Sequence, residues 1–186
     1  MNKNLKSLTE YPFYFLRELL TTVENNAKET LGLHIGEPKN DPPEEALALL
    51  NKHSDLYSKY PTSKGEYFLR ESYCDWLESR FDIHSIDPDQ NVLPVSGSRE
   101  GIFSFIQAVI DTSKKNPTVI IPNPFYKIYE GAATMAGAKT YYINSLAENN
   151  FKPNFEDVPE DIWKDCLLYT SDAADEGLGV DLGGRR

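Results

Sequence analysis

A short apolar run leads through a Ser/Gly turn into an amphipathic helix pattern between Asn91 and Ile110. The run Val92–Val95 predicts a buried strand, and the turn after it reads Ser-Gly-Ser-Arg-Glu-Gly. Apolar residues then recur at the spacing of one helix face, at Ile102, Phe105, Ile106, Val109 and Ile110. A strand that turns directly into a helix is the repeating unit of an α/β fold, so this segment predicts an α/β domain with a mainly parallel sheet.

The Ser/Gly turn is suited to bind an anion. Backbone N–H groups in the first turn of a helix have no acceptor within the helix, and the helix dipole favours negative charge there. Ser96 and Ser98 add hydroxyl donors, and Arg99 adds a positive charge. We interpret the turn as a phosphate site, with a plain helix cap as the alternative. The segment contains neither the glycine fingerprint of dinucleotide-binding folds nor that of P-loops.

Two further strands continue the α/β pattern. The runs Val119–Ile121 and Thr140–Ile143 predict short strands, and Tyr126–Ala136 predicts the helix between them. Ligands of parallel sheets bind beyond the carboxyl ends of the strands. The turn at Ser96 and the turn Asn123–Tyr126 both follow strand ends, so we expect them to face one pocket.

The remaining helices are predicted in the first half of the chain. Their apolar spacing and acidic first turns place them at Phe13–Val23, Glu44–Asn51 and Phe68–Phe81. We expect Arg70 and Glu71 to be solvated charges on the face of the last of these helices.

Composition narrows the class of protein. The 186 residues are 40% hydrophobic, which is enough apolar content for a packed core, and the net charge is −10. Acidic charge argues against nucleic-acid and anionic-membrane partners, and no apolar run approaches transmembrane length. The two cysteines, Cys74 and Cys166, and three scattered histidines have no metal-ligand spacing. We expect no metal and a cytoplasmic location.

Four motifs together resemble a known family. They occur in the order LHIGEP, YPTSKGEYFLRESYCDWL, VLPVSGSREGIF and IPNPFYKIYEGAATMAGA. This order is similar to that of class I and II aminotransferases, which are fold-type-I enzymes that use pyridoxal 5′-phosphate. The resemblance covers residues 1–165. It implies a three-layer α/β/α fold with a mostly parallel sheet, an N-terminal arm and small-domain segment at 1–44, and part of the large cofactor-binding domain at 45–165.

The resemblance also implies roles for individual residues. Tyr126 matches the aromatic residue that stacks on the pyridine ring of the cofactor. Tyr60 matches a tyrosine that reaches the cofactor phosphate of the partner subunit, which implies a homodimer. Gly36 matches a small residue beside the substrate carboxylate. The residues that match the first phosphate-binding turn are Ser96, Gly97, Ser98 and Arg99.

The resemblance stops near Asp165. It implies that the lysine that carries the cofactor as a Schiff base lies downstream, so we assign no catalytic residue and expect this chain to be inactive and poorly stable alone. It also implies that Val92–Val95 lies at one edge of the sheet, away from the other two strands. The block CLLYTSDAADE resembles a translated sequencing adapter, so we expect residues 166–186 to be a non-native tail.

The function implied for the intact parent is amino transfer between an amino acid, glutamate, and a keto acid. The sequence around Tyr126 is most similar to that of family members that act on succinyldiaminopimelate. The resemblance therefore implies N-succinyl-2-amino-6-ketopimelate, in lysine biosynthesis, as the acceptor. Two alternatives stay open: a pyridoxal-phosphate-binding regulator domain without catalysis, and a phosphate-binding module of the nucleotide kind.

Overall fold

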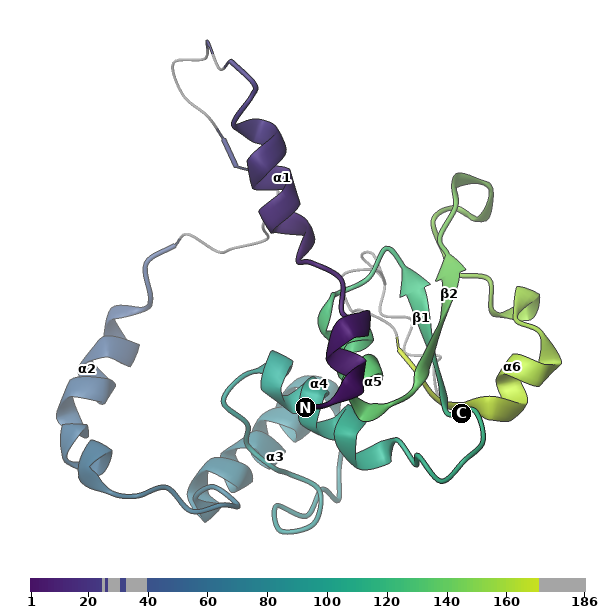
Figure 1. Ribbon diagram of the computed structural model, residues 1–186. Coiled ribbons are helices and arrows are strands. Elements are labelled where there is room, and N and C mark those ends of the chain that lie inside the picture. Colours follow the sequence, from purple (N-terminus) through teal and green to yellow (C-terminus); the bar gives the residue numbers. More distant parts are fainter. Residues whose placement is uncertain (25, 27–30, 33–39, 171–186) are drawn as a thin grey trace. The chain divides into compact units, whose positions relative to one another are not determined.

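The computed structural model describes residues 1–24, 26, 31–32 and 40–170 (Figure 1). The chain divides into two compact units. One unit combines Met1–Val23 with the chain from Val95 onward, and the other is Glu24–Pro94. The sequence-based boundary at residue 44 differs from both of these divisions and stays a prediction.

A three-stranded parallel sheet forms the centre of the first unit. Strand β1 (Thr118–Asn123) lies between β2 (Lys139–Asn144) and β3 (Cys166–Tyr169). Figure 1 shows β1 and β2 side by side. Helix α5 (Ile128–Ala136) connects them, and the short helix α6 (Glu160–Asp165) leads into β3.

Apolar side chains pack against both faces of β1. This two-sided burial accounts for the apolar residues at three consecutive positions, Val119–Ile121. On one face, Val119 and Ile121 pack with Ile106 of α4 (Ser98–Val109) and with α5. On the other face, Ile120 packs with Ile143 and Val158. The described part of this unit thus has the layering of a partial α/β/α fold.

The N-terminal segment belongs to the same unit. It contains a 3₁₀ turn, η1 (Lys3–Ser7), and helix α1 (Pro12–Leu20), and two further 3₁₀ turns, η3 (Ala147–Asn149) and η4 (Phe155–Asp157), lie between β2 and α6. The second unit contains α2 (Glu44–Lys52), the 3₁₀ turn η2 (Ser54–Ser58) and α3 (Tyr67–Phe81).

Most predicted elements are confirmed, and two differ. Residues Val92–Val95 form no strand, and Leu93 and Val95 are exposed. The sequence-based interpretation of a buried strand is wrong there, because no described segment pairs with this run. Strand β3 begins at Cys166 and pairs with β1, so the sheet continues into the segment that we expected to lie outside the fold.

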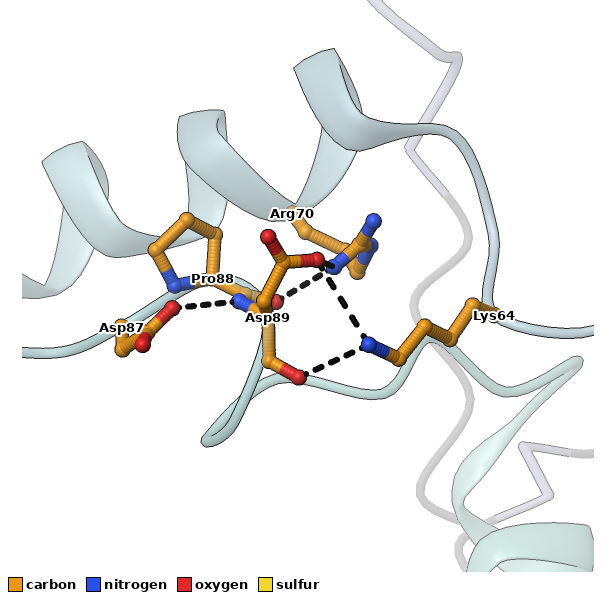
Figure 2. Close-up of polar contacts among 5 residues, drawn as sticks. All are labelled: Lys64, Arg70, Asp87, Pro88 and Asp89. Carbon is orange, nitrogen blue, oxygen red and sulfur yellow. Dashed lines mark hydrogen bonds and ion pairs between the residues drawn. The ribbon is translucent and has the colours of Figure 1, made fainter.

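Arg70 of α3 is buried, with 5% of its surface exposed, so the expectation that it is a solvated charge is wrong. Its Nη1 donates to the carbonyl of Pro88 and to Oδ1 of Asp89, both at 2.7 Å (Figure 2). Lys64 Nζ donates to the Asp89 carbonyl at 3.0 Å, and the Asp89 amide donates to Asp87 Oδ1 at 2.7 Å. These contacts fix the turn at 87–91 against α3. Glu71 is exposed, as expected.

Candidate functional site

Helix α4 begins with open backbone donors. Gly97 is its N-cap, with φ 150° and ψ 159°, and the first helical hydrogen bond runs from the Gly101 amide to the Gly97 carbonyl at 3.1 Å. The cap makes no side-chain hydrogen bond. The amides of the first turn, from Ser98 onward, therefore have no acceptor within the helix and are available to an anion.

Gly97 provides space that another residue would fill. Its φ lies in a region that residues with a Cβ rarely adopt. A Cβ at this position would lie 2.9 Å from Oε2 of Glu100, so the Glu100 carboxylate folds back over the first turn. This helix end thus already faces a negative group, and an incoming phosphate would have to displace it.

Arg99 links the two turns that the sequence analysis expects to face one pocket. Its Nε donates to the Tyr126 hydroxyl at 3.0 Å, and this hydrogen bond raises the pKa of the Arg99 guanidinium. Tyr126 follows the carboxyl end of β1 and meets Tyr129 edge-on, with ring centroids 6.1 Å apart. The contact between Arg99 and Tyr126 therefore places an aromatic ring beside the first turn of α4.

These features fit a phosphorylated aromatic ligand. The first turn of α4 offers backbone donors, Gly97 adds no side chain to the approach, and the hydroxyl-bearing Ser96 and Ser98 are exposed. The helix dipole and the Arg99 guanidinium favour negative charge. Tyr126, which is partly buried, supplies an aromatic ring at the same end of the sheet.

A polar cluster that the sequence analysis missed joins the N-terminal segment to α5 and β2. Glu130 forms an ion pair with Lys127, accepts from the Tyr142 hydroxyl at 2.5 Å and accepts from the Thr9 hydroxyl at 3.5 Å. Burial acts to raise the pKa of the Glu130 carboxyl, but the hydrogen bonds from Lys127 and Tyr142 outweigh it and lower that pKa. The i,i+3 spacing of Lys127 and Glu130 was the only signal in the sequence.

Two of the sequence-predicted residues come from the other unit, Glu24–Pro94. Tyr60 follows η2 in the second unit, and its side chain is 96% exposed. Gly36 lies outside the described residues. Among the described helices, none combines the length and the apolar character that crossing a membrane requires.

Comparison with known proteins gives one consistent result. A model of the family described as aminotransferase class I and II matches residues 28–170. An LL-diaminopimelate aminotransferase of Dehalococcoides mccartyi is 30% identical over 164 residues, which is 87% of this chain and 41% of that protein. One from Aquifex aeolicus is 31% identical over 166 residues, 88% of this chain and 42% of that protein.

Solved structures agree with the sequence matches. An aminotransferase from Neisseria meningitidis superimposes with a TM-score of 0.83 and 38% identity, over 91% of this chain and 43% of that chain. The aminotransferase AspB from Helicobacter pylori gives a TM-score of 0.78 and 34% identity, over 87% of this chain and 41% of that chain. The chain thus spans about two fifths of the length of the proteins that it matches.

Proposed function

This chain belongs to the class I and II aminotransferase family, whose members depend on pyridoxal 5′-phosphate, and we propose that it supplies the cofactor-phosphate part of such an enzyme. The observation that carries the proposal is the open first turn of α4, capped by Gly97 and joined through Arg99 to Tyr126.

Each residue of the turn has a distinct role in this proposal. The backbone amides that follow Gly97 and the Ser96 and Ser98 hydroxyls hold the phosphate, and Arg99 offsets its charge. Arg99 also holds the Tyr126 hydroxyl, so that the ring of Tyr126 is kept where it can stack on the pyridine ring. When bound, the cofactor supplies an electron sink for the substrate Cα during amino transfer.

Two further roles are proposed on the family resemblance. Tyr60 reaches the cofactor phosphate of a partner subunit in a homodimer. Its exposure in the second unit is compatible with this role. Gly36 lies beside the substrate carboxylate. No lysine in this chain matches the cofactor-binding lysine of the family, so we propose that the chain alone does not catalyse amino transfer.

The proposed substrates are glutamate as amino donor and a keto acid of the diaminopimelate branch of lysine biosynthesis, N-succinyl-2-amino-6-ketopimelate. The relatives named LL-diaminopimelate aminotransferase support a substrate from the diaminopimelate branch, but they do not support a succinyl group on that substrate. An assay of the intact parent, with the succinylated keto acid in one arm and LL-diaminopimelate in the other, tests this choice. Faster turnover of LL-diaminopimelate would reject the succinylated substrate.

The cofactor site is tested in a chimera. Residues 1–170 of this chain replace the matching segment of the Neisseria meningitidis aminotransferase, which is 38% identical. We expect the chimera to bind pyridoxal phosphate, and we expect Ser98→Ala to weaken binding about tenfold, the effect of one charge-assisted hydrogen bond. Ser104→Ala, an exposed serine further along α4, is the matched control.

A chimera that folds, as judged by circular dichroism, but binds no pyridoxal phosphate would reject the proposal. Binding without amino transfer to any keto acid would favour the alternative of a regulator domain.

A further inference from the structure

One tyrosine of β2 holds the chain on both sides of Tyr126. Phe125 precedes Tyr126 and Lys127 follows it. The ring of Phe125 stacks on the ring of Tyr142, with centroids 5.4 Å apart and the ring planes at 23°. The Tyr142 hydroxyl donates to Oε1 of Glu130 at 2.5 Å, and Oε2 of the same carboxylate accepts from Lys127. We call these four residues around Tyr126 the Tyr142 cluster.

The ion pair of this cluster is largely shielded from solvent. The side chains of Lys127 and Glu130 are 23% and 17% exposed. An ion pair with so little exposure is screened less by water and salt than a pair on the open surface. Lys127 is the N-cap of α5 and Glu130 lies in its first turn, so the pair also fastens the start of this helix.

Strand β2 gives the cluster a fixed base, because it is tied to the strand from which the turn emerges. Asn123, the last residue of β1, pairs in register with Asn144 of β2. The Asn123 side-chain amide donates to Oδ1 of Asn144 at 2.8 Å, and the Ser145 amide donates to the Asn123 carbonyl at 2.8 Å. Tyr142, two residues before Asn144, therefore has a defined position relative to the start of the turn.

The ring of Tyr126 needs more than its contact with Arg99. Arg99 holds only the hydroxyl, which is the far end of the ring. A ring held at that one point can still tilt, so its plane depends on the backbone that carries it. Stacking between aromatic rings depends on this plane. The Tyr142 cluster supplies the backbone support that the contact with Arg99 lacks.

We propose that Tyr142 and Glu130 are positioning residues for the cofactor ring: they hold the backbone around Tyr126, so that its ring stays at the angle at which it stacks on a pyridine ring. This inference rests on the proposed function, which places the pyridine ring on Tyr126. The phosphate is held separately, by the first turn of α4. Loss of the cluster should therefore weaken binding of the ring and leave binding of the phosphate unchanged.

The test separates ring binding from phosphate binding in the chimera. One probe is pyridoxamine 5′-phosphate, which has the ring and the phosphate but no aldehyde to react with a lysine. The other is inorganic phosphate, which has no ring. We expect Tyr142→Leu to weaken binding of the first probe about fivefold, the size of one aromatic contact, and binding of the second less than about 1.5-fold.

Two further variants refine the test. Tyr142→Phe keeps the stack on Phe125 and loses only the donor to Glu130, so we expect it to weaken binding of pyridoxamine 5′-phosphate about twofold. Tyr141→Leu is the matched control. Tyr141 packs on the opposite face of β2, beside Ile120 and Ile143, and is less exposed than Tyr142, so its loss removes at least as much packing. We expect it to change neither affinity.

Circular dichroism in the absorption band of the bound pyridine ring reports how that ring is oriented. We expect Tyr142→Leu to lower the amplitude at saturation about twofold, because the ring of Tyr126 is no longer held at one angle. Tyr141→Leu should leave the amplitude unchanged. A residue that only stabilises the fold would not alter the signal of the saturated protein.

The 186-residue chain gives a measurement that needs no cofactor. The Tyr129 amide donates to the Tyr126 carbonyl, and the Gly131 amide donates to the Lys127 carbonyl, both at 3.1 Å. We expect hydrogen exchange of these two amides, relative to the amides of α4, to speed up about fivefold in Tyr142→Leu and to stay the same in Tyr141→Leu.

Three results would overturn the inference: equal weakening of both probes by Tyr142→Leu, an unchanged dichroism amplitude at saturation, or unchanged exchange of the two amides. Failure of the proposed cofactor site looks different. The unsubstituted chimera would then bind neither probe, and this would overturn the inference together with the proposed function.

Discussion

At the scale of single residues, the hydrogen bond between Arg99 and Tyr126 carries the most functional information. The sequence indicated an anion-binding turn, because Ser-Gly-Ser lies between an apolar run and a helix. It could not indicate that Arg99 is held by a hydroxyl 27 positions later, because that contact depends on the packing of α4 against α5. For the same reason the burial of Arg70 was missed, since its partners come from a turn 18 and 19 residues away.

Glu100 competes with a phosphate for the first turn of α4. We predict that Glu100→Gln in the chimera lowers the dissociation constant for pyridoxal phosphate about two- to fivefold, because a negative charge at a helix N-terminus contributes roughly 0.3–1 kcal/mol. Glu148→Gln, in the distant turn η3, is the control and should have no effect. The measurement is a binding titration at low ionic strength. Weaker binding by Glu100→Gln would contradict the competition.

Arg70 stabilises the turn at 87–91 against α3. We predict that Arg70→Met lowers the free energy of opening of α3 by about 1–3 kcal/mol, because the Pro88 carbonyl and the Asp89 carboxylate lose their donor. Hydrogen exchange of the α3 amides in the chimera measures this change. Arg80→Met, at an exposed position of the same helix, should change it by less than about 0.5 kcal/mol.

At the scale of elements, helices and strands follow the apolar periodicity closely. The helix predicted at Glu44–Asn51 is α2, and the strands predicted at Val119–Ile121 and Thr140–Ile143 lie within β1 and β2. The strand predicted at Val92–Val95 does not form, because a strand needs a neighbouring strand to pair with as well as an apolar sequence pattern. Periodicity reports which residues can be buried, and a pairing partner decides whether they become a strand.

Gly131 inside α5 and Gly137 at its C-terminal cap should respond in opposite directions to the same substitution. Gly137 ends the helix with φ 87°, so we predict that Gly137→Ala destabilises α5 by about 1 kcal/mol. Gly131 lies inside the helix, and a Cβ there would meet nothing within 4 Å. We therefore predict that Gly131→Ala stabilises α5 by about 0.5–1 kcal/mol. Thermal unfolding of the two chimera variants checks the signs, and equal shifts would contradict this geometry.

The polar cluster around Glu130 should make stability depend on pH. The pKa of Glu130 is lowered in the folded state, so its contribution is present above the unfolded value and is lost as the pH falls through the folded value. Tyr142→Phe removes one donor to Glu130. We predict that this variant is less stable than the parent at pH 7 and that the difference shrinks only as the pH falls below the ordinary pKa of a glutamate, through the lowered pKa of Glu130.

Unfolding of the chimera in urea at several pH values measures this dependence. Tyr141→Phe is the control, because the neighbouring tyrosine leaves the donor to Glu130 in place. A stability difference for Tyr142→Phe that stays constant as the pH falls from 7 to well below the ordinary pKa of a glutamate would exclude Glu130 as its source.

At the scale of the whole molecule, the chain has the core of an α/β domain but leaves much apolar surface open. The buried residues cluster around β1, whereas large side chains of α4 and the end of β3 stay exposed. The family and its fold could be predicted from four motifs in order. The end of the sheet could not, because β3 lies in a stretch that the sequence analysis had set aside as non-native.

We predict that the 186-residue chain is only marginally stable alone. Exposed apolar surface and an open sheet edge leave little free energy to offset the entropy of folding. Hydrogen exchange between Val92 and Ile143 should show opening free energies below about 3 kcal/mol. Well-protected amides throughout this range would contradict the prediction.

The central claim is that the first turn of α4 holds the phosphate of pyridoxal 5′-phosphate. The most direct measurement compares the affinity of the chimera for pyridoxal 5′-phosphate and for pyridoxal, which lacks the phosphate. The account predicts a preference of at least tenfold for the phosphorylated form, reduced by Ser98→Ala and kept by Ser104→Ala. Equal affinity for the two compounds, or a preference that Ser98→Ala leaves unchanged, would contradict it.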